Sequence, residues 1–170
     1  TGSGRDHLKS LAGDPSRVHL VYHGLDFRRF PAPPDRQISG DGRSASAAVE
    51  ILSVGRLVEK KGYDLLIAAL AALPPDLHWR FTHIGGGDSK NTLAGKARDL
   101  GLANRIDWRG AEPQERVLKA LKESDIFVLP SRITKSGDRD GLPNVLMEAQ
   151  SQRLACISTE ISAIPELILP

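Results

Sequence analysis

Two carboxylates eight positions apart, Asp140 and Glu148, stand out near the end of the chain. Asp140 follows a polar loop, and Glu148 lies inside residues 142–152, where apolar residues at helical spacing predict a helix. The first amides of a helix have no intrahelical partner and can bind an anion. These positions are Gly141, Leu142, Pro143 and Asn144. A carboxylate at the position of Glu148 can accept two hydrogen bonds from a vicinal diol such as ribose, or simply face solvent as part of an amphipathic helix.

A short basic loop offers a second anion-binding element. Arg56 follows Gly55, and Lys61 stands just before the next predicted helix. An arginine can clamp phosphate oxygens with its planar guanidinium, and a lysine adds a point charge. Taken alone, Arg56 and Lys61 are explained at least as well as solvated loop charges that bind no ligand.

Three consecutive glycines, which include Gly85 and Gly87, follow another predicted strand. Glycine lets a backbone approach a ligand closely. The run is similar to the start of a dinucleotide fingerprint, but Lys90 occupies the position of the third glycine. NAD binding is therefore disfavoured, and a tight turn remains the alternative.

Asp138 and Asp140 flank Arg139 and could hold a divalent cation beside a diphosphate. Arg56 and Lys61 already supply positive charge, so we expect neither a metal nor another cofactor. The five histidines are scattered and lack the spacing of a metal site.

The elements that must position these residues alternate along the chain. Apolar runs or alternating apolar and polar residues predict strands at 17–23, 49–54, 79–84, 105–109, 125–129 and 155–159. Helical spacing predicts helices at 62–73, 91–100, 114–122 and 142–152. Such alternation predicts an α/β, Rossmann-like, three-layer fold with a parallel sheet and helices on both faces. Ligands of these sheets bind outside the carboxyl ends of the strands, where every polar feature above lies.

The composition narrows the function further. The chain has 170 residues and a net charge of +2, which is too small to indicate a nucleic-acid partner. The single cysteine, Cys156, excludes an intrachain disulfide, and no apolar run approaches the roughly 20 residues of a membrane span. We expect residues 1–48 to be an entry strand and linker from an absent N-terminal domain. Residues 49–170 then form a nucleotide-binding domain that is incomplete at its C-terminal end.

Six segments in order resemble the C-terminal, donor-binding half of a family 4 glycosyltransferase, a retaining enzyme of the GT-B type (glycosyl transferases group 1). They are residues 21–30, 54–62, 84–88, 125–131, 141–149 and 158–167. The resemblance covers nearly the whole chain from Val18. It implies one half of a GT-B fold, truncated at its C-terminal end.

The resemblance also implies roles. Arg56 and Lys61 would bind the donor diphosphate, the amides of residues 141–144 would cradle it, and Glu148 would hold the ribose. The loop that contains Gly110 and Ala111 would run alongside the nucleotide base. Asp140 stands where the family usually has a glutamate that touches the transferred sugar, which leaves the sugar open. The long loop 132–139 is similar to a branch that assembles exopolysaccharide and lipopolysaccharide.

The implied reaction is retaining transfer from a UDP- or GDP-linked sugar to a saccharide or lipid-linked acceptor bound by the absent domain. The isolated chain would bind nucleotide with little or no turnover. The full-length protein would be cytoplasmic, with peripheral attachment at the inner face of the membrane left open. The alternatives are a GT-B nucleotide-sugar epimerase, a non-catalytic nucleotide-binding module and a dinucleotide-dependent oxidoreductase.

Overall fold

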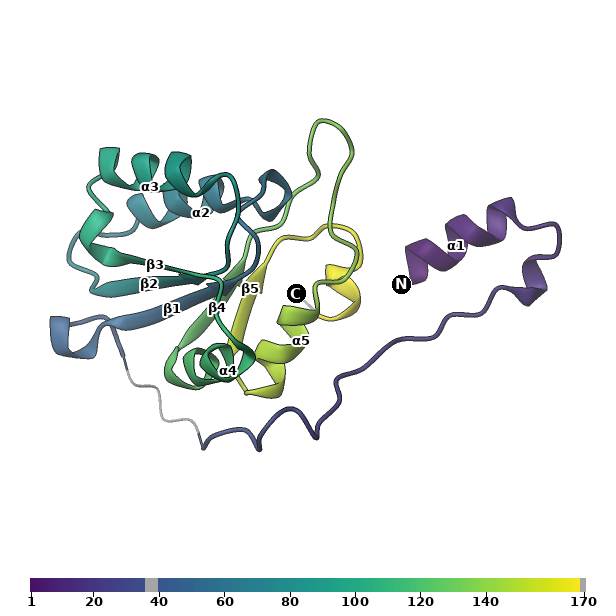
Figure 1. Cartoon of the computed structure of the whole chain (residues 1–170), viewed down its shortest axis with the longest axis horizontal. Coiled ribbons are helices and arrows are strands. Elements are labelled where there is room, and N and C mark those ends of the chain that lie inside the picture. Colours follow the sequence, from purple (N-terminus) through teal and green to yellow (C-terminus); the bar gives the residue numbers. More distant parts are fainter. Residues whose placement is uncertain (36–39, 169–170) are drawn as a thin grey trace.

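A computed structural model of the chain describes residues 1–35 and 40–168. Its centre is a five-stranded sheet in the order β3-β2-β1-β4-β5, with every neighbouring pair parallel (Figure 1). The strands are β1 Val49–Val54, β2 Trp79–Ile84, β3 Ile106–Gly110, β4 Ile126–Leu129 and β5 Ala155–Ser158. The parallel sheet expected from the alternating pattern is confirmed.

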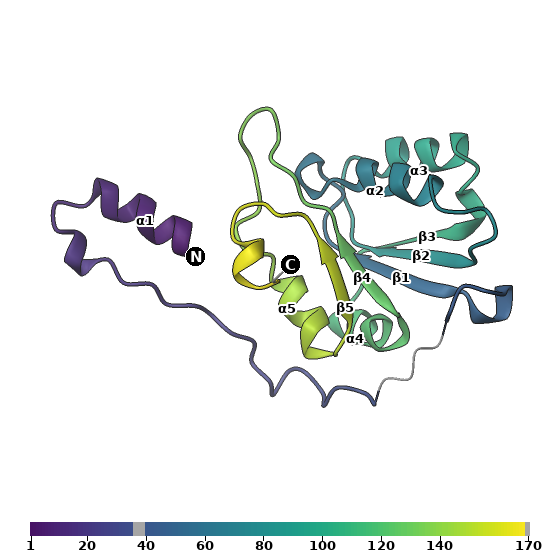
Figure 2. The same ribbon diagram turned by 180° about the vertical axis from the view of Figure 1, so that it is seen from behind.

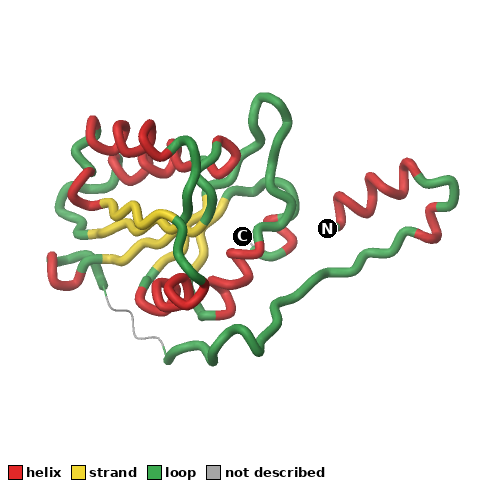
Figure 3. The backbone as a smooth tube through the Cα atoms, in the orientation of Figure 1, coloured by secondary structure: helices red, strands yellow, loops and turns green. Residues whose placement is uncertain are grey.

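Helices cover both faces of the sheet. They are α2 Tyr63–Ala71, α3 Lys90–Asp99, α4 Gln114–Glu123 and α5 Asn144–Ser151. α2 and α3 lie together on one face, and α4 and α5 lie on the other, as the views from both sides show (Figures 1 and 2). The tube view shows the same three layers of helix, strand and helix (Figure 3).

The core forms where the apolar stripes of the helices meet the sheet. Leu52 and Phe127, neighbours on β1 and β4, are fully buried. Ile67 of α2, Leu121 of α4 and Leu146 of α5 are buried as well. β4 is a continuous apolar run, as expected of a strand covered on both faces, whereas β1 includes Glu50 and the buried Ser53 among its apolar residues.

Two expectations about local structure are wrong. Residues 17–23 form no strand: Pro15–Arg17 is a 3-10 turn, and the chain beyond it is extended without a sheet partner. Val21 is 83% exposed, so its alternation with polar residues reflects no buried face. α5 begins at Asn144 rather than at residue 142, because Leu142 precedes a proline and Pro143 itself is extended.

The first residues form a helix that the pattern did not predict, α1 Gly2–Leu11, whose first turn is capped by the Thr1 side chain. An extended segment then leads from α1 toward the sheet (Figure 2). It is tied to the C-terminal part of the chain, since Tyr22 donates to Glu166 over 2.6 Å and Gln152 donates to the Pro31 carbonyl over 3.3 Å. Part of the predicted linker, residues 36–39, lies outside the described residues. Among the residues described, no helix is long and apolar enough to cross a membrane.

Candidate functional site

The sheet has one topological switch point, between β1 and β4. From β1 the chain adds β2 and β3 on one side, and then returns to add β4 and β5 on the other. The loops that leave β1 and β4 therefore lie next to each other at the carboxyl edge, where ligands of such sheets bind. Arg56 and Lys61 lie on the first loop, and Asp140 lies on the second.

The glycines expected at the donor site join loops to one another. Gly85 has a φ of +141°, and a Cβ there would lie 2.0 Å from the carbonyl oxygen of Gly55. A Cβ at Gly87 would lie 2.5 Å from the carbonyl oxygen of Leu57, and the Leu57 amide donates to the Gly86 carbonyl over 2.8 Å. These contacts press the turn after β2 against the basic loop after β1, which fixes the backbone that carries Arg56.

A second close approach joins the basic loop to the loop after β4. Gly62 has a φ of +67°, and a Cβ there would lie 1.9 Å from the carbonyl oxygen of Pro130. Lys61, directly before it, forms an ion pair with Asp140 across the switch point, 2.8 Å between Nζ and Oδ2. The two side chains are only 12% and 14% exposed, and Ser131 donates to the same carboxylate over 3.0 Å. The structure therefore joins two of the predicted site residues directly.

The loop that follows Ser131 is held by ion pairs that involve Lys60, Arg132 and Asp64, three residues that the sequence did not single out. Lys60 pairs with Asp138 at 3.0 Å and lies 4.0 Å from Asp140. Arg132 pairs with Asp64 at 2.9 Å, so one end of residues 132–139 is tied to the start of α2 and the other to the 3-10 turn before it. Between these ties the loop projects from the carboxyl edge (Figure 1). The sequence shows that Lys60 is adjacent to Lys61, but it does not show which of the two lysines contacts which carboxylate.

Arg56 differs from Lys61. Its side chain is exposed, and within the described part of the chain it forms no ion pair or hydrogen bond. An unpaired guanidinium beside the switch point is free to bind an external anion.

The start of α5 follows the loop after β4, directly beyond Asp140. Gly141 and Asn144 are exposed, and Leu142 is half-buried. Pro143 is buried and has no N–H, so the amides that can bind an anion come from its neighbours. The Oδ1 atom of Asn144 lies 2.6 Å from a ring nitrogen of His23, in the extended N-terminal segment.

Glu148 is half-buried one turn beyond Asn144. Burial raises the pKa of this carboxyl, and the positive charge of Arg29 opposes the shift. Arg29 also donates to the side chain of Gln114 on α4, over 2.8 Å. The N-terminal segment thus brings His23 and Arg29 to α5, a contact between distant parts of the chain that local patterns do not reveal.

The loop after β3 lies farther along the same edge. Gly110 has a φ of +76°, and its carbonyl accepts from the Gly85 amide over 2.7 Å. Ala111 is exposed. The next residue, Glu112, has a buried carboxylate oxygen without a hydrogen-bond partner among the described residues. The structure places this loop two strands away from β1, beyond the glycine turn.

An aromatic layer lies beneath the carboxyl edge. His83, on β2, is fully buried, and its ring centroid lies 4.6 Å from that of Tyr63 and 5.4 Å from that of Trp108. Neither ring nitrogen has a hydrogen-bond partner among the described residues, and burial lowers the pKa of His83 to about 4.

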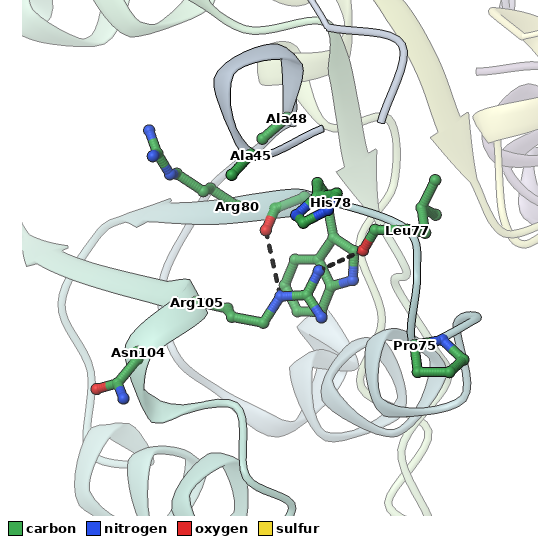
Figure 4. A pocket seen from close by; sticks show the side chains of 9 residues that line it. Ala45, Ala48, Pro75, Leu77, His78, Arg80, Asn104 and Arg105 are labelled. Atoms are coloured by element: carbon green, nitrogen blue, oxygen red, sulfur yellow. Dashed lines mark hydrogen bonds between the residues drawn. The ribbon is translucent and has the colours of Figure 1, made fainter. Parts of the chain in front are cut away.

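Two cavities lie at opposite edges of the sheet. One, of about 400 Å³, is lined by Asp140, Gly141, Ser162 and the N-terminal residues Thr1 and Ser3, among others. The other, of about 250 Å³, lies at the amino edge and is lined by Trp79 and Arg105 (Figure 4). Within residues 1–35 and 40–168, no group of three histidine, cysteine or acidic side chains is placed to hold a metal ion.

Residues 36–170 match the family model described as glycosyl transferases group 1. The chain belongs to this family. It is 41% identical over 121 residues to the amylovoran biosynthesis glycosyltransferase AmsK of Erwinia amylovora, a match that covers 71% of the chain and 30% of the relative. It is 32% identical to the putative colanic acid biosynthesis glycosyltransferase WcaL of Salmonella typhimurium, covering 95% of the chain and 38% of the relative. The chain therefore spans about a third of the length of these relatives.

Solved structures support the GT-B fold. The apo lipopolysaccharide outer core galactosyltransferase WaaB superposes with a TM-score of 0.73 at 24% identity, covering 98% of this chain and 43% of that one. Anabaena HepE in complex with UDP superposes with a TM-score of 0.79 at 17% identity, covering 100% and 46%. At these sequence identities the structural similarity supports the fold of this chain alone.

Proposed function

We propose that this chain is the nucleotide-sugar-binding part of a retaining, family 4 glycosyltransferase that builds a polysaccharide, lipopolysaccharide or glycolipid. The observation that supports it best is the unpaired Arg56, on the loop after β1 at the switch point, where the neighbouring loop after β4 leads to the start of α5. Membership of the glycosyl transferases group 1 and similarity to enzymes named for amylovoran and colanic acid biosynthesis agree with this function.

The donor diphosphate would lie between Arg56, Lys61 and the amides at the start of α5. Glu148 would accept hydrogen bonds from the ribose, the loop at Gly110 and Ala111 would pass the base, and Asp140 would touch the transferred sugar. As the glycosidic bond to the donor breaks, negative charge develops on the departing diphosphate. Fixed positive charge and the helix dipole stabilise that charge without rearrangement. We propose that these groups stabilise the departing diphosphate without a metal.

The acceptor, a saccharide or lipid-linked saccharide, would bind to an N-terminal domain joined through residues 1–48. A GT-B cleft is built from both halves, so the isolated chain would bind the donor with little or no turnover. A measurable transfer rate from the isolated chain would contradict this part of the proposal. We propose that the full-length protein is cytoplasmic, with peripheral attachment at the inner face of the membrane left open.

Calorimetric titration with UDP, GDP, ADP and NAD tests the donor site and identifies the base. Arg56→Ala should weaken binding about tenfold or more, the value of one charge-assisted contact. Lys61→Ala should weaken it as well. Arg98→Ala is the matched control, because Arg98 is an exposed arginine near the end of α3. Loss of binding in all three variants alike, or tight binding of NAD alone, would contradict the proposal.

A further inference from the structure

The ion pair between Lys61 and Asp140 raises a question about the proposed donor site. Lys61 is one of the two cations proposed to bind the diphosphate, yet its ammonium group is already engaged by a carboxylate at 2.8 Å. Both side chains are mostly buried, and Ser131 donates to the same carboxylate oxygen. An ion pair so shielded from water keeps much of its strength.

Charge is balanced in this cluster before any ligand arrives. Lys60 and Lys61 provide two positive charges, and Asp138 and Asp140 provide two negative ones, with Nζ–carboxylate distances of 2.8 to 4.0 Å. A phosphate that approaches Lys61 must therefore compete with Asp140. It also meets the repulsion of that carboxylate, which stands immediately before the proposed phosphate-binding amides.

We infer that Asp140 makes the site discriminate between a nucleotide sugar and a bare nucleoside diphosphate. The inference rests on the proposed function. A sugar hydroxyl that donates to Asp140 replaces the hydrogen bond from Lys61 and releases the ammonium group to the diphosphate. A bare diphosphate carries no such hydroxyl, so Asp140 stays on Lys61 and the phosphate binds weakly.

The consequence is coupling between the sugar and the phosphate parts of the site. Each part binds more tightly when the other is occupied, because both require the ion pair between Lys61 and Asp140 to open and the first ligand group opens it for the second. The donor is thereby favoured over the nucleoside diphosphate that remains after transfer, and release of that product is eased.

Asp140→Asn tests the inference in the 170-residue chain. Asparagine keeps the size of the side chain and an acceptor for Ser131, but it removes the charge that holds Lys61. The probes are UDP and GDP, each without a sugar, titrated by calorimetry so that the unknown sugar does not matter. We expect Asp140→Asn to bind the matching nucleoside diphosphate about tenfold more tightly than the wild type, the value of one charge-assisted contact.

Two controls separate this mechanism from a general change in charge. Asp138→Asn also removes one negative charge, but Asp138 is 60% exposed and pairs with Lys60, so its effect should stay within about twofold. In a Lys61→Gln background, adding Asp140→Asn should give a smaller gain than in the wild type, because only the repulsion between Asp140 and the phosphate is then removed. Thermal unfolding of each variant verifies that it folds.

The outcomes also distinguish this inference from the proposed function. Unchanged or weaker binding by Asp140→Asn, while Arg56→Ala still weakens binding, overturns the inference and leaves the donor site standing. An equal gain in Asp138→Asn overturns it too. If no nucleoside diphosphate binds to the wild type or to any variant, the proposed function and the inference both fail.

Discussion

The two edges of the parallel sheet carry similar residues but use them differently. At the amino edge, Arg105 lies over the Trp79 ring, 4.0 Å from its centroid, and donates to the carbonyls of Leu77 and Trp79 over 2.6 and 3.3 Å (Figure 4). At the carboxyl edge, Arg56 is exposed and forms no contact of this kind with any described residue.

Both edges contain a cavity, so a cavity alone does not identify a site. The difference lies in whether polar groups are already satisfied. The guanidinium of Arg105 already donates to two backbone carbonyls. The carboxyl edge keeps a free guanidinium and the first amides of a helix, and these can be satisfied by a ligand.

The largest effect should come from Gly85→Ala, because the joint between the two carboxyl-edge loops leaves no room for a Cβ. A Cβ there would lie 2.0 Å from the Gly55 carbonyl oxygen at a φ of +141°. We expect the free energy of unfolding to fall by about 3–4 kcal/mol, measured by urea denaturation. Gly86→Ala is the matched control, since nothing lies within 4 Å of a Cβ at Gly86. Equal losses in both variants would show that the turn is not held by this contact.

His83 gives the carboxyl edge a pH dependence. Burial lowers its pKa to about 4, from 6.5 for an exposed histidine. Between pH 6.5 and 4 the unfolded chain binds a proton at this position and the folded chain does not, so stability falls as the pH falls. Above pH 6.5 His83 is neutral in the folded and the unfolded chain, so it does not lower the free energy of unfolding. By pH 4 we expect the free energy of unfolding to be about 3 kcal/mol lower because of this residue.

Urea denaturation at several pH values measures this loss, with His83→Leu as the comparison. The variant keeps the other four histidines, so it should be less sensitive to pH over this window by the amount that His83 contributes. Parallel curves for the wild type and the variant would mean that His83 does not titrate as its burial requires.

The sheet could be predicted from the sequence because its strands are short apolar or alternating segments between turn residues. The predicted 49–54 and 79–84 match β1 and β2, and 105–109 differs from β3 by one residue at each end. The parallel topology then brought Arg56, Lys61 and Asp140 to one edge. This much depends on local pattern and on the rules that connect parallel strands.

The contacts between distant segments could not be predicted in the same way. Residues 17–23 alternate like a strand, but a strand also needs an open edge to pair with, and the pattern does not show one. The pairing of Lys61 with Asp140 depends on how closely Gly62 approaches Pro130, which no local pattern encodes. His23 and Asn144 are in contact although they lie 121 positions apart in the sequence.

The smallest effect, and the one that tests the comparison most directly, should come from Arg105→Ala. We expect it to lower the free energy of unfolding by about 2 kcal/mol, because two carbonyls lose a charged donor and the Trp79 ring loses its cation. Nucleoside diphosphate affinity should not change. Arg56→Ala should do the reverse, weakening the nucleotide while the unfolding curve stays in place. If Arg105→Ala weakens the nucleotide as much as Arg56→Ala does, the cavity at the amino edge also binds the ligand, and the distinction between satisfied and free cations fails.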